Sequence, residues 1–287
     1  MTRHKIIGIG ELVWDMLPGG RKLGGAPVNF AYWCSCLGAE GYPLSAAGDD
    51  EPGRDAFEML AGTGLDLGYM QRNRLPTGRV DITLSGKGIP EYDIVENVAW
   101  DALEAGDKAL RLAAQADAVC WGSLAQRSEA SRRAICAILD ATPDKCLKVF
   151  DINLRQHWYT GDIVTGSLRK ADVLKLNEEE LPLVASLLGI GKSGADAIAE
   201  LIGEFSLQYV IYTAGADRSE IHSAEGLLSC IPTPEVEVAD TVGAGDSFTA
   251  AFITSLLQGD PVAVCHRKAV ETAAKVCTVH GAMPQRL

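Results

Sequence analysis

The sequence contains no apolar run of the ~20 residues that a membrane-spanning helix needs. Residues 1–10 begin with basic side chains but lack the long apolar core of a secretory signal, so we expect no signal peptide. Internal repeats, low-complexity segments and long linkers are also absent. These absences predict a cytoplasmic protein without a membrane partner.

Metal-binding patterns of cysteine and histidine are missing as well. The eight cysteines form no Cys-x-x-Cys pair, and no second pair joins Cys34 and Cys36 to complete a zinc site. Several cysteines lie in apolar runs, such as Cys120 beside Trp121, so we expect reduced cysteines in the core. The five histidines show no pairing at metal-ligand spacing.

Basic residues are too few for a nucleic-acid-binding surface. The chain has 26 Lys and Arg against 38 Asp and Glu, a net charge of −12, which repels phosphate backbones. A single nucleotide is not excluded, because backbone N–H groups at a helix start and a metal can hold a small anion.

Two familiar nucleotide-binding motifs are each incomplete in this sequence. Residues 189–193 are similar to the end of a P-loop, but Ser186 stands where its first glycine is required. Gly8-Ile9-Gly10 follows a strand, but Val13 replaces the last glycine of the dinucleotide fingerprint.

The composition is otherwise that of a globular protein, with 47% hydrophobic and 22% charged residues in 287. Apolar runs alternate with helical patterns from about 116 to 260, which predicts a mostly parallel sheet covered by helices. Ser128 is expected to cap the first of these helices. The expected strands are 6–9, 118–121, 148–152, 173–176 and 209–212, and the expected helices are 128–139, 178–188, 195–205 and one that begins near 246.

Residues 77–98 follow another pattern. Apolar and polar residues alternate on both sides of a turn at residues 85–88, which predicts a half-exposed β-hairpin. Residues 11–16 are expected to add a strand. We therefore predict one domain over 1–287, in which lid elements near 11–22 and 77–98 form a small β-sheet beside an α/β core.

The segment that indicates chemistry is Gly243-Ala244-Gly245, followed by Asp246 and an apolar helical pattern. Small residues let an anion approach the backbone, and the unpaired N–H groups and dipole of a helix start favour a phosphate there. By itself, however, a glycine and an aspartate at a helix start more often form a cap.

Residues 240–246 as a whole, Asp-Thr-Val-Gly-Ala-Gly-Asp, resemble the C-terminal signature of the ribokinase (PfkB) family of sugar and nucleoside kinases. Other short matches follow in order along the whole chain, and the ordered set is specific although each match is weak. The resemblance implies a ribokinase-like three-layer α/β/α core with a mostly parallel sheet and a small β-sheet lid. The matching segments are Asp15, Gly24-Gly25-Ala26-Pro27-Val28-Asn29, Asp151-Ile152-Asn153-Leu154-Arg155, Asn177-Glu178-Glu179-Glu180, Thr213-Ala214-Gly215 and Gly281-Ala282.

The resemblance implies an ATP-dependent kinase that moves the γ-phosphoryl group to a sugar hydroxyl. Asp246 would be the base, and Gly243, Ala244 and Gly245 would form an anion hole. An aspartate with its ordinary pKa of ~4 is a weak base for an alcohol, but it suffices if the proton leaves late in a loose transfer.

The same resemblance assigns sugar contacts to Asp15, Gly24, Gly25 and Asn29, and a phosphate contact to Arg155. Three alternatives remain open from the residues alone. Asn29 could cap a helix start, Asp15 could be a turn residue, and Arg155 could form a surface ion pair.

For the nucleotide side, the resemblance assigns ATP contacts to Asn177, Thr213, Gly215 and Gly245. Asn177 and Glu180 would hold magnesium, Glu180 through water. The alternative is a capping box, since the two residues have its spacing, and both roles are compatible.

The resemblance also implies a possible potassium ion near Asp240 and a possible homodimer through the lid. Arg218 and Val270 depart from the family pattern, which leaves nucleotide preference open; Arg218 could reach a nucleotide phosphate. The motifs most resemble bacterial fructokinase-like members, so we expect fructose phosphorylated on its 6-hydroxyl. Ribose, 2-keto-3-deoxygluconate or a nucleoside is the alternative substrate, and a non-catalytic sugar-binding regulator is the alternative function.

Overall fold

The computed structural model describes residues 3–17, 19–84 and 90–284, so the turn predicted at residues 85–88 lies outside the described residues. Its main sheet has eight strands in the order β14-β13-β12-β11-β10-β9-β1-β4. The six strands from β4 to β12 are parallel, and β13 and β14 are antiparallel additions at one edge. The mostly parallel sheet that the sequence predicts is therefore confirmed.

The strands have the following bounds: β1 Lys5–Ile9, β2 Val13–Leu17, β3 Gly20–Gly24, β4 Glu40–Leu44, β5 Ala46–Gly48, β6 Gln71–Asn73, β7 Arg79–Leu84, β8 Pro90–Ile94, β9 Ala118–Trp121, β10 Leu147–Asp151, β11 Val173–Asn177, β12 Tyr209–Ala214, β13 Arg218–Ser223 and β14 Gly226–Pro232. The α-helices are α1 Ala26–Cys36, α2 Glu51–Ala61, α3 Asp107–Ala113, α4 Glu129–Asp140, α5 Gly161–Leu168, α6 Glu180–Leu188, α7 Gly194–Phe205, α8 Ala244–Leu257 and α9 Val262–Cys277. Two short 3₁₀ helices cover Ala99–Ala102 and Leu124–Arg127.

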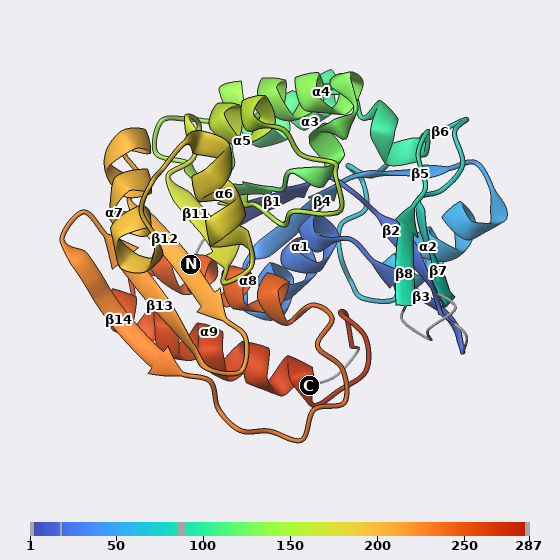
Figure 1. Ribbon diagram of the computed structural model, residues 1–287. Helices are drawn as coiled ribbons and strands as arrows, with labels where there is room; N and C mark the ends of the chain where they lie inside the picture. The colour runs from blue at the N-terminus through green and yellow to red at the C-terminus, as the bar shows by residue number, and fades with distance from the viewer. Residues whose placement is uncertain (1–2, 18, 85–89, 285–287) are drawn as a thin grey trace.

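Helices cover both faces of the main sheet. One apolar cluster joins the sheet to α3, α4, α5, α6 and α7, and a second joins it to α1, α8 and α9. Figure 1 shows these two helical layers above and below the strands. Gly8 permits a close approach on the second face, because a Cβ there would lie 2.0 Å from the carbonyl oxygen of Pro27 in α1. The three-layer α/β/α architecture predicted above is the observed one.

The expected strands and helices are found within one or two residues of their predicted bounds. Ser128 stands at the N-cap of α4, but its hydroxyl donates to the carbonyl oxygen of Asp101, so the predicted side-chain cap is wrong. The sequence pattern did not reveal β4, an edge strand that contains Pro43. An edge position tolerates a proline because one row of backbone N–H groups there has no ladder partner.

A second sheet has the order β3-β2-β7-β8. Strand β2 pairs antiparallel with β3 and parallel with β7, so the segments near 11–22 and 77–98 share one small sheet, as predicted. The strand expected at 11–16 begins later, at Val13, and Glu11 and Leu12 before it are buried. Figure 1 shows the small sheet at one end of the molecule.

All eight cysteines are free thiols. Cys34, Cys120, Cys146 and Cys265 are buried as expected, but Cys36 and Cys230 are exposed, so the core assignment is wrong for those two. Within the described residues, no helix has both the length and the apolar character needed to cross a bilayer.

Candidate active site

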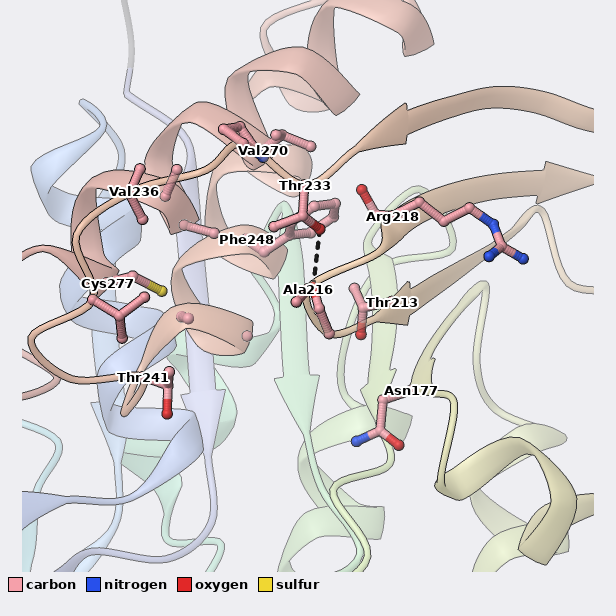
Figure 2. Close-up of a pocket in the computed structure, with 18 of the residues that line it drawn as sticks. Asn177, Thr213, Ala216, Arg218, Thr233, Val236, Thr241, Phe248, Val270 and Cys277 are labelled. Carbon is pink, nitrogen blue, oxygen red and sulfur yellow. Dashed lines mark hydrogen bonds between the residues drawn. The ribbon is translucent and has the colours of Figure 1, made fainter.

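A cavity of about 840 Å³ opens beside the carboxyl ends of β11 and β12, against α8 and α9. Figure 2 shows its walls: Val236, Phe248, Val270 and Cys277 gather toward one side, and Asn177 and Thr213 lie on the other. Ligands of open α/β sheets bind at this edge, outside the carboxyl ends of parallel strands. The cavity thus has an apolar side that suits a flat base and a polar side near the start of α8.

Helix α8 begins at Ala244, and Gly243 is its N-cap with φ +82°. A Cβ on Gly243 would lie 2.8 Å from Ala282, so only glycine fits both the backbone angle and the packing. Ala244 and Gly245 line the cavity, whereas Gly243 is not among its described lining residues. The first turn of α8 therefore faces the cavity, and Gly243 shapes the turn that places it there.

Asp246 lies in this first turn and meets a residue from the other end of the chain. The Nδ2 atom of Asn29 donates to Oδ2 of Asp246 at 2.7 Å. Burial and the carboxylate of Asp151 raise the pKa of Asp246, the Asn29 hydrogen bond lowers it, and the net value is about 6. The expectation of an ordinary pKa near 4 is wrong, and the observed environment makes Asp246 a stronger base.

Asn29 does not cap a helix. It lies within the first turn of α1, where its N–H donates to the Gly25 carbonyl oxygen at 2.9 Å, and its side chain is buried against Asp246. Gly25 is the N-cap at φ +123°, and a Cβ there would lie 2.3 Å from the carbonyl oxygen of Glu11.

Asp15 and Gly24 lie side by side on β2 and β3. A Cβ on Gly24 would lie 3.3 Å from Oδ2 of Asp15, so the glycine leaves this carboxylate uncovered. Burial raises the pKa of Asp15, while Arg155 and Lys22 lower it. Asp15 is therefore a strand residue in the small sheet, not a turn residue.

Arg155 follows β10 and is exposed. Its positive charge lowers the pKa of Glu11, Asp15 and Asp246, which places its guanidinium in the field of the same three carboxyl groups. It makes no ion pair within the described part of the chain, so the surface ion-pair alternative is not what the structure shows.

Asn177 and Glu180 form reciprocal capping hydrogen bonds. Oδ1 of Asn177 accepts from the N–H groups of Glu179 and Glu180, both at 2.9 Å. Oε2 of Glu180 accepts from the N–H of Asn177, and its Oε1 accepts from Leu154, also at 2.9 Å. The reciprocal hydrogen bonds of the capping-box alternative are thus present, but they close the turn before α6, whose N-cap is Glu179. The described residues of this turn that line the cavity are Asn177, Glu178 and Glu179.

Asp240 pairs with a cation supplied by the chain. Nζ of Lys22, on β3, lies 2.8 Å from Oδ2 of Asp240, and the N–H groups of Val242 and Gly281 also donate to this carboxylate. These contacts lower the pKa of Asp240 to about 2 despite its burial. The ion pair joins the small sheet to the loop that leads into α8.

Thr213, Gly215 and Arg218 lie on the cavity wall at the end of β12 and the start of β13. The guanidinium of Arg218 pairs with Glu220 and Asp217. Figure 2 shows it pointing away from Thr213 and Val270. Nε of Arg218 is thus engaged by Glu220, and Nη1 by Asp217.

Sequence reasoning missed a buried ionic cluster beside Gly245. Lys175 on β11 lies with Nζ 3.1 Å from Oδ1 of Asp151, and the Thr249 hydroxyl donates to Oδ2 of Asp151 at 3.0 Å. The sequence contained a signal for this cluster. Lys175 stands in an otherwise apolar central strand, and a lysine that is buried there must have a partner. Glu11 is a second missed residue: it is 3% exposed, and burial raises its pKa to about 7.

Comparison with known proteins decides the family. The pfkB family carbohydrate kinase profile matches residues 12–286. The chain belongs to the pfkB family of carbohydrate kinases. The family's fructokinase from Klebsiella pneumoniae is 32% identical over 270 residues, covering 88% of this chain and 84% of the relative. Fructokinase from Escherichia coli is 29% identical over 280 residues, covering 88% and 84%.

Solved structures of the family share the fold. An uncharacterised sugar kinase from Pyrococcus horikoshii in complex with ATP superposes with a TM-score of 0.82 at 25% identity, covering 97% of this chain and 94% of the other. Fructokinase from Xylella fastidiosa with bound ATP superposes with a TM-score of 0.85 at 20% identity, covering 98% and 94%. The core with its small sheet is therefore ribokinase-like.

Proposed function

We propose that this chain transfers the γ-phosphoryl group of ATP to the 6-hydroxyl of fructose. The observation that carries the proposal is the 2.7 Å hydrogen bond between Asn29 and Asp246, which joins the two ends of the chain beside the first turn of α8. The names of the K. pneumoniae and E. coli relatives support fructose as the sugar.

Asp246 takes the hydroxyl proton in this proposal. A base with a pKa of about 6 is ionised at neutral pH and lies closer to the working pH than an ordinary aspartate. Asn29 holds the carboxylate in place through Oδ2, which leaves Oδ1 for the hydroxyl. As the proton moves to Asp246, the sugar oxygen bonds to the γ-phosphorus and the bond from phosphorus to the β–γ bridging oxygen breaks. Adenosine diphosphate is the leaving group.

Asp15, with the space left by Gly24, and Arg155 are proposed to bind the sugar and a phosphate. Asp15 is a partly buried acceptor on an inner strand of the small sheet, and Arg155 supplies a fork of donors suited to phosphate oxygens. The small sheet of β3, β2, β7 and β8 is proposed as the lid that excludes water, because β2 carries Asp15 and β3 carries Gly24.

The cavity is proposed to bind ATP, with the base on its apolar side and the phosphates toward Thr213, Gly215 and Gly245. ATP-bound structures of the P. horikoshii and X. fastidiosa proteins support this assignment. The anion hole of the proposal is formed by the backbone N–H groups at the start of α8.

Magnesium fits the turn at residues 177–180, because carboxylate and amide oxygens are its preferred ligands. Glu178 and Glu179 line the cavity there, and Glu180 would act through water, since both its oxygens already accept backbone hydrogen bonds. The metal would neutralise charge on the phosphates. The described residues contain no cluster of three or more metal-ligating His, Cys, Asp or Glu side chains, so the turn does not supply a full set of ligands by itself.

Potassium fits Asp240 less well. Fructokinase from Vibrio cholerae has been solved with fructose, ADP and potassium, but the carboxylate of Asp240 here already accepts from the Lys22 ammonium and two N–H groups. We propose that potassium, if used, binds through backbone carbonyl oxygens near Asp240. A homodimer through the edges of the small sheet stays a prediction, tested by the molar mass in solution.

The test is sugar-dependent release of ADP from magnesium-ATP, with fructose, ribose, 2-keto-3-deoxygluconate and nucleosides as acceptors. We expect fructose to be turned over, and Asp246→Asn to lower kcat by about 100-fold or more. The matched control is Asp260→Asn beyond the other end of α8, which should keep the wild-type rate. Turnover of a different sugar would correct the substrate, and sugar binding without turnover would identify a regulator instead.

A further inference from the structure

Two cationic side chains are present among the described residues that line the cavity, Lys175 and Arg218. A polyphosphate in an acidic protein needs a local positive charge, because the net charge of −12 repels it. The guanidinium of Arg218 pairs with Glu220 and Asp217 near the rim. Lys175 is therefore the cation placed deep in the cavity.

Lys175 lies directly against the first turn of α8. A Cβ added to Gly245 would be 3.2 Å from Nζ of Lys175, and 3.9 Å from Cε. Because Gly245 has no side chain, the space between its backbone and the ammonium group stays open. An anion held by the start of α8 would be within reach of Nζ.

The ammonium group is fixed by a buried network. Nζ of Lys175 lies 3.1 Å from Oδ1 of Asp151. The Thr249 hydroxyl lies 3.0 Å from both Oδ2 of Asp151 and the carbonyl oxygen of Gly245, and these two acceptors share its single proton. The Lys175 and Asp151 side chains are 11% and 8% exposed, and Thr249 is fully buried. The network ties the position of Nζ to the backbone of the α8 first turn.

Lys175 stays charged in this setting. Burial disfavours the ammonium form, but the carboxylates of Asp151, Glu180 and Asp246 hold the pKa of Lys175 above its usual value. The ammonium group has three N–H donors, and its one ion pair among the described residues is with Asp151. A phosphate oxygen is the kind of group that can share the ammonium group.

We propose that Lys175 is a catalytic residue that contacts the phosphoryl group in transfer, and that Asp151 and Thr249 position it. This proposal rests on the function proposed above. Lys175 gives up no proton: the hydroxyl proton goes to Asp246, and the ammonium stabilises negative charge on the phosphoryl oxygens as the bond from the sugar oxygen to phosphorus forms.

The decisive variant is the double substitution Lys175→Met with Asp151→Asn. Lys175→Met alone leaves Asp151 as an unpaired buried charge and risks misfolding, whereas the double variant removes both charges and keeps an acceptor for Thr249. Asp151→Asn alone is the reference, since it retains the ammonium. Lys148→Met, on the neighbouring strand β10 and not among the lining residues, is the matched control for loss of a lysine.

We expect kcat of the double variant to be about 100-fold or more below that of Asp151→Asn, with Lys148→Met unchanged. In calorimetry, the non-hydrolysable analogue AMP-PNP should bind the double variant at least 10-fold more weakly than wild type, while AMP binds equally. A rate within threefold of Asp151→Asn, or an equal loss of AMP and AMP-PNP affinity, would overturn the proposal. If the wild-type protein binds nucleotide but turns over no sugar, the proposed function fails, and the affinity ratio still decides the role of Lys175.

Discussion

The raised pKa of Asp246 suits its proposed role as a base, but it also makes the folded protein less stable at neutral pH. Burial and the carboxylate of Asp151 raise its pKa to about 6, above the ordinary value of 3.8. Because the unfolded chain binds the proton less tightly than the folded chain, ionisation of Asp246 at neutral pH opposes folding. Asp246→Asn should therefore keep or raise the melting temperature while it removes activity, and a lower melting temperature would contradict this account.

The pH dependence of the reaction follows from the same residue. The base must be ionised, so we expect kcat/KM to fall as the pH drops through about 6, with a slope of one proton. Asn29→Leu removes a hydrogen bond that favours the ionised form, so it should move this limb to higher pH. The measurement is a pH profile of kcat/KM for both proteins.

Glu11 is the control in that experiment, since its pKa is raised to about 7 by burial and by the nearby carboxylate of Asp246. Glu11→Gln removes this second group. If the acid limb disappears in Glu11→Gln and persists in Asn29→Leu at its wild-type position, the limb belongs to Glu11 and the assignment to Asp246 is wrong.

At the scale of the element, helix α8 is flanked by two glycines that have similar backbone angles but different packing. Gly243 at the N-cap has φ +82°, and Gly259 beyond the C-terminus has φ +85°. A Cβ on Gly243 would lie 2.8 Å from Ala282, whereas nothing lies within 4 Å of a Cβ on Gly259. The two sites therefore share the conformational cost of alanine and differ in the steric contact.

We expect Gly259→Ala to destabilise the protein by about 1–2 kcal/mol, the cost of a left-handed angle, with little change in kcat. Gly243→Ala should be destabilised further and should lose most activity, because the start of α8 must shift away from Ala282. Chemical denaturation and steady-state kinetics on both variants test this. Equal stability losses would show that the contact with Ala282 relaxes freely.

At the scale of the whole molecule, the proposed sugar and nucleotide sites come from different parts of the chain. Asp15, Gly24 and Asn29 lie in the first 29 residues, whereas the cavity is lined by residues 175–277. The Lys22–Asp240 ion pair and the Asn29–Asp246 hydrogen bond join the two parts.

Hydrogen exchange can separate the two sites, because ligand binding slows the local opening that exposes amides. Magnesium-ADP should protect residues 213–219 and 233–245, and fructose should protect residues 11–29. The control is exchange at 129–140, which covers α4, far from the cavity lining, and should not change. Protection by fructose confined to 213–245 would contradict the proposed division.

Local pattern by itself determined the parallel core and the segment that leads into α8. Buried central strands such as β9 and β11 have near-continuous apolar runs, and the glycines before Asp246 indicate a helix start open to an anion. These features depend on residues that are close together in the sequence, so the amino-acid sequence alone was sufficient to predict them. The family resemblance added separate roles for distant motifs, a sugar contact for Asn29 and the base for Asp246, but the hydrogen bond between the two residues came from the structure.

Only the tertiary structure decided the charges of the site. The raised pKa of Asp246, the ion pair of Lys22 with Asp240 and the network of Lys175 with Asp151 and Thr249 all depend on burial and on partners 24 to 218 positions away. The sequence pattern also did not predict edge strands such as β4, which contains Pro43. Pairing with a neighbouring strand of the sheet, and not the local sequence, makes this segment a strand. Desolvation and long-range contact are properties of the folded chain, and they raise the pKa of the proposed base, Asp246.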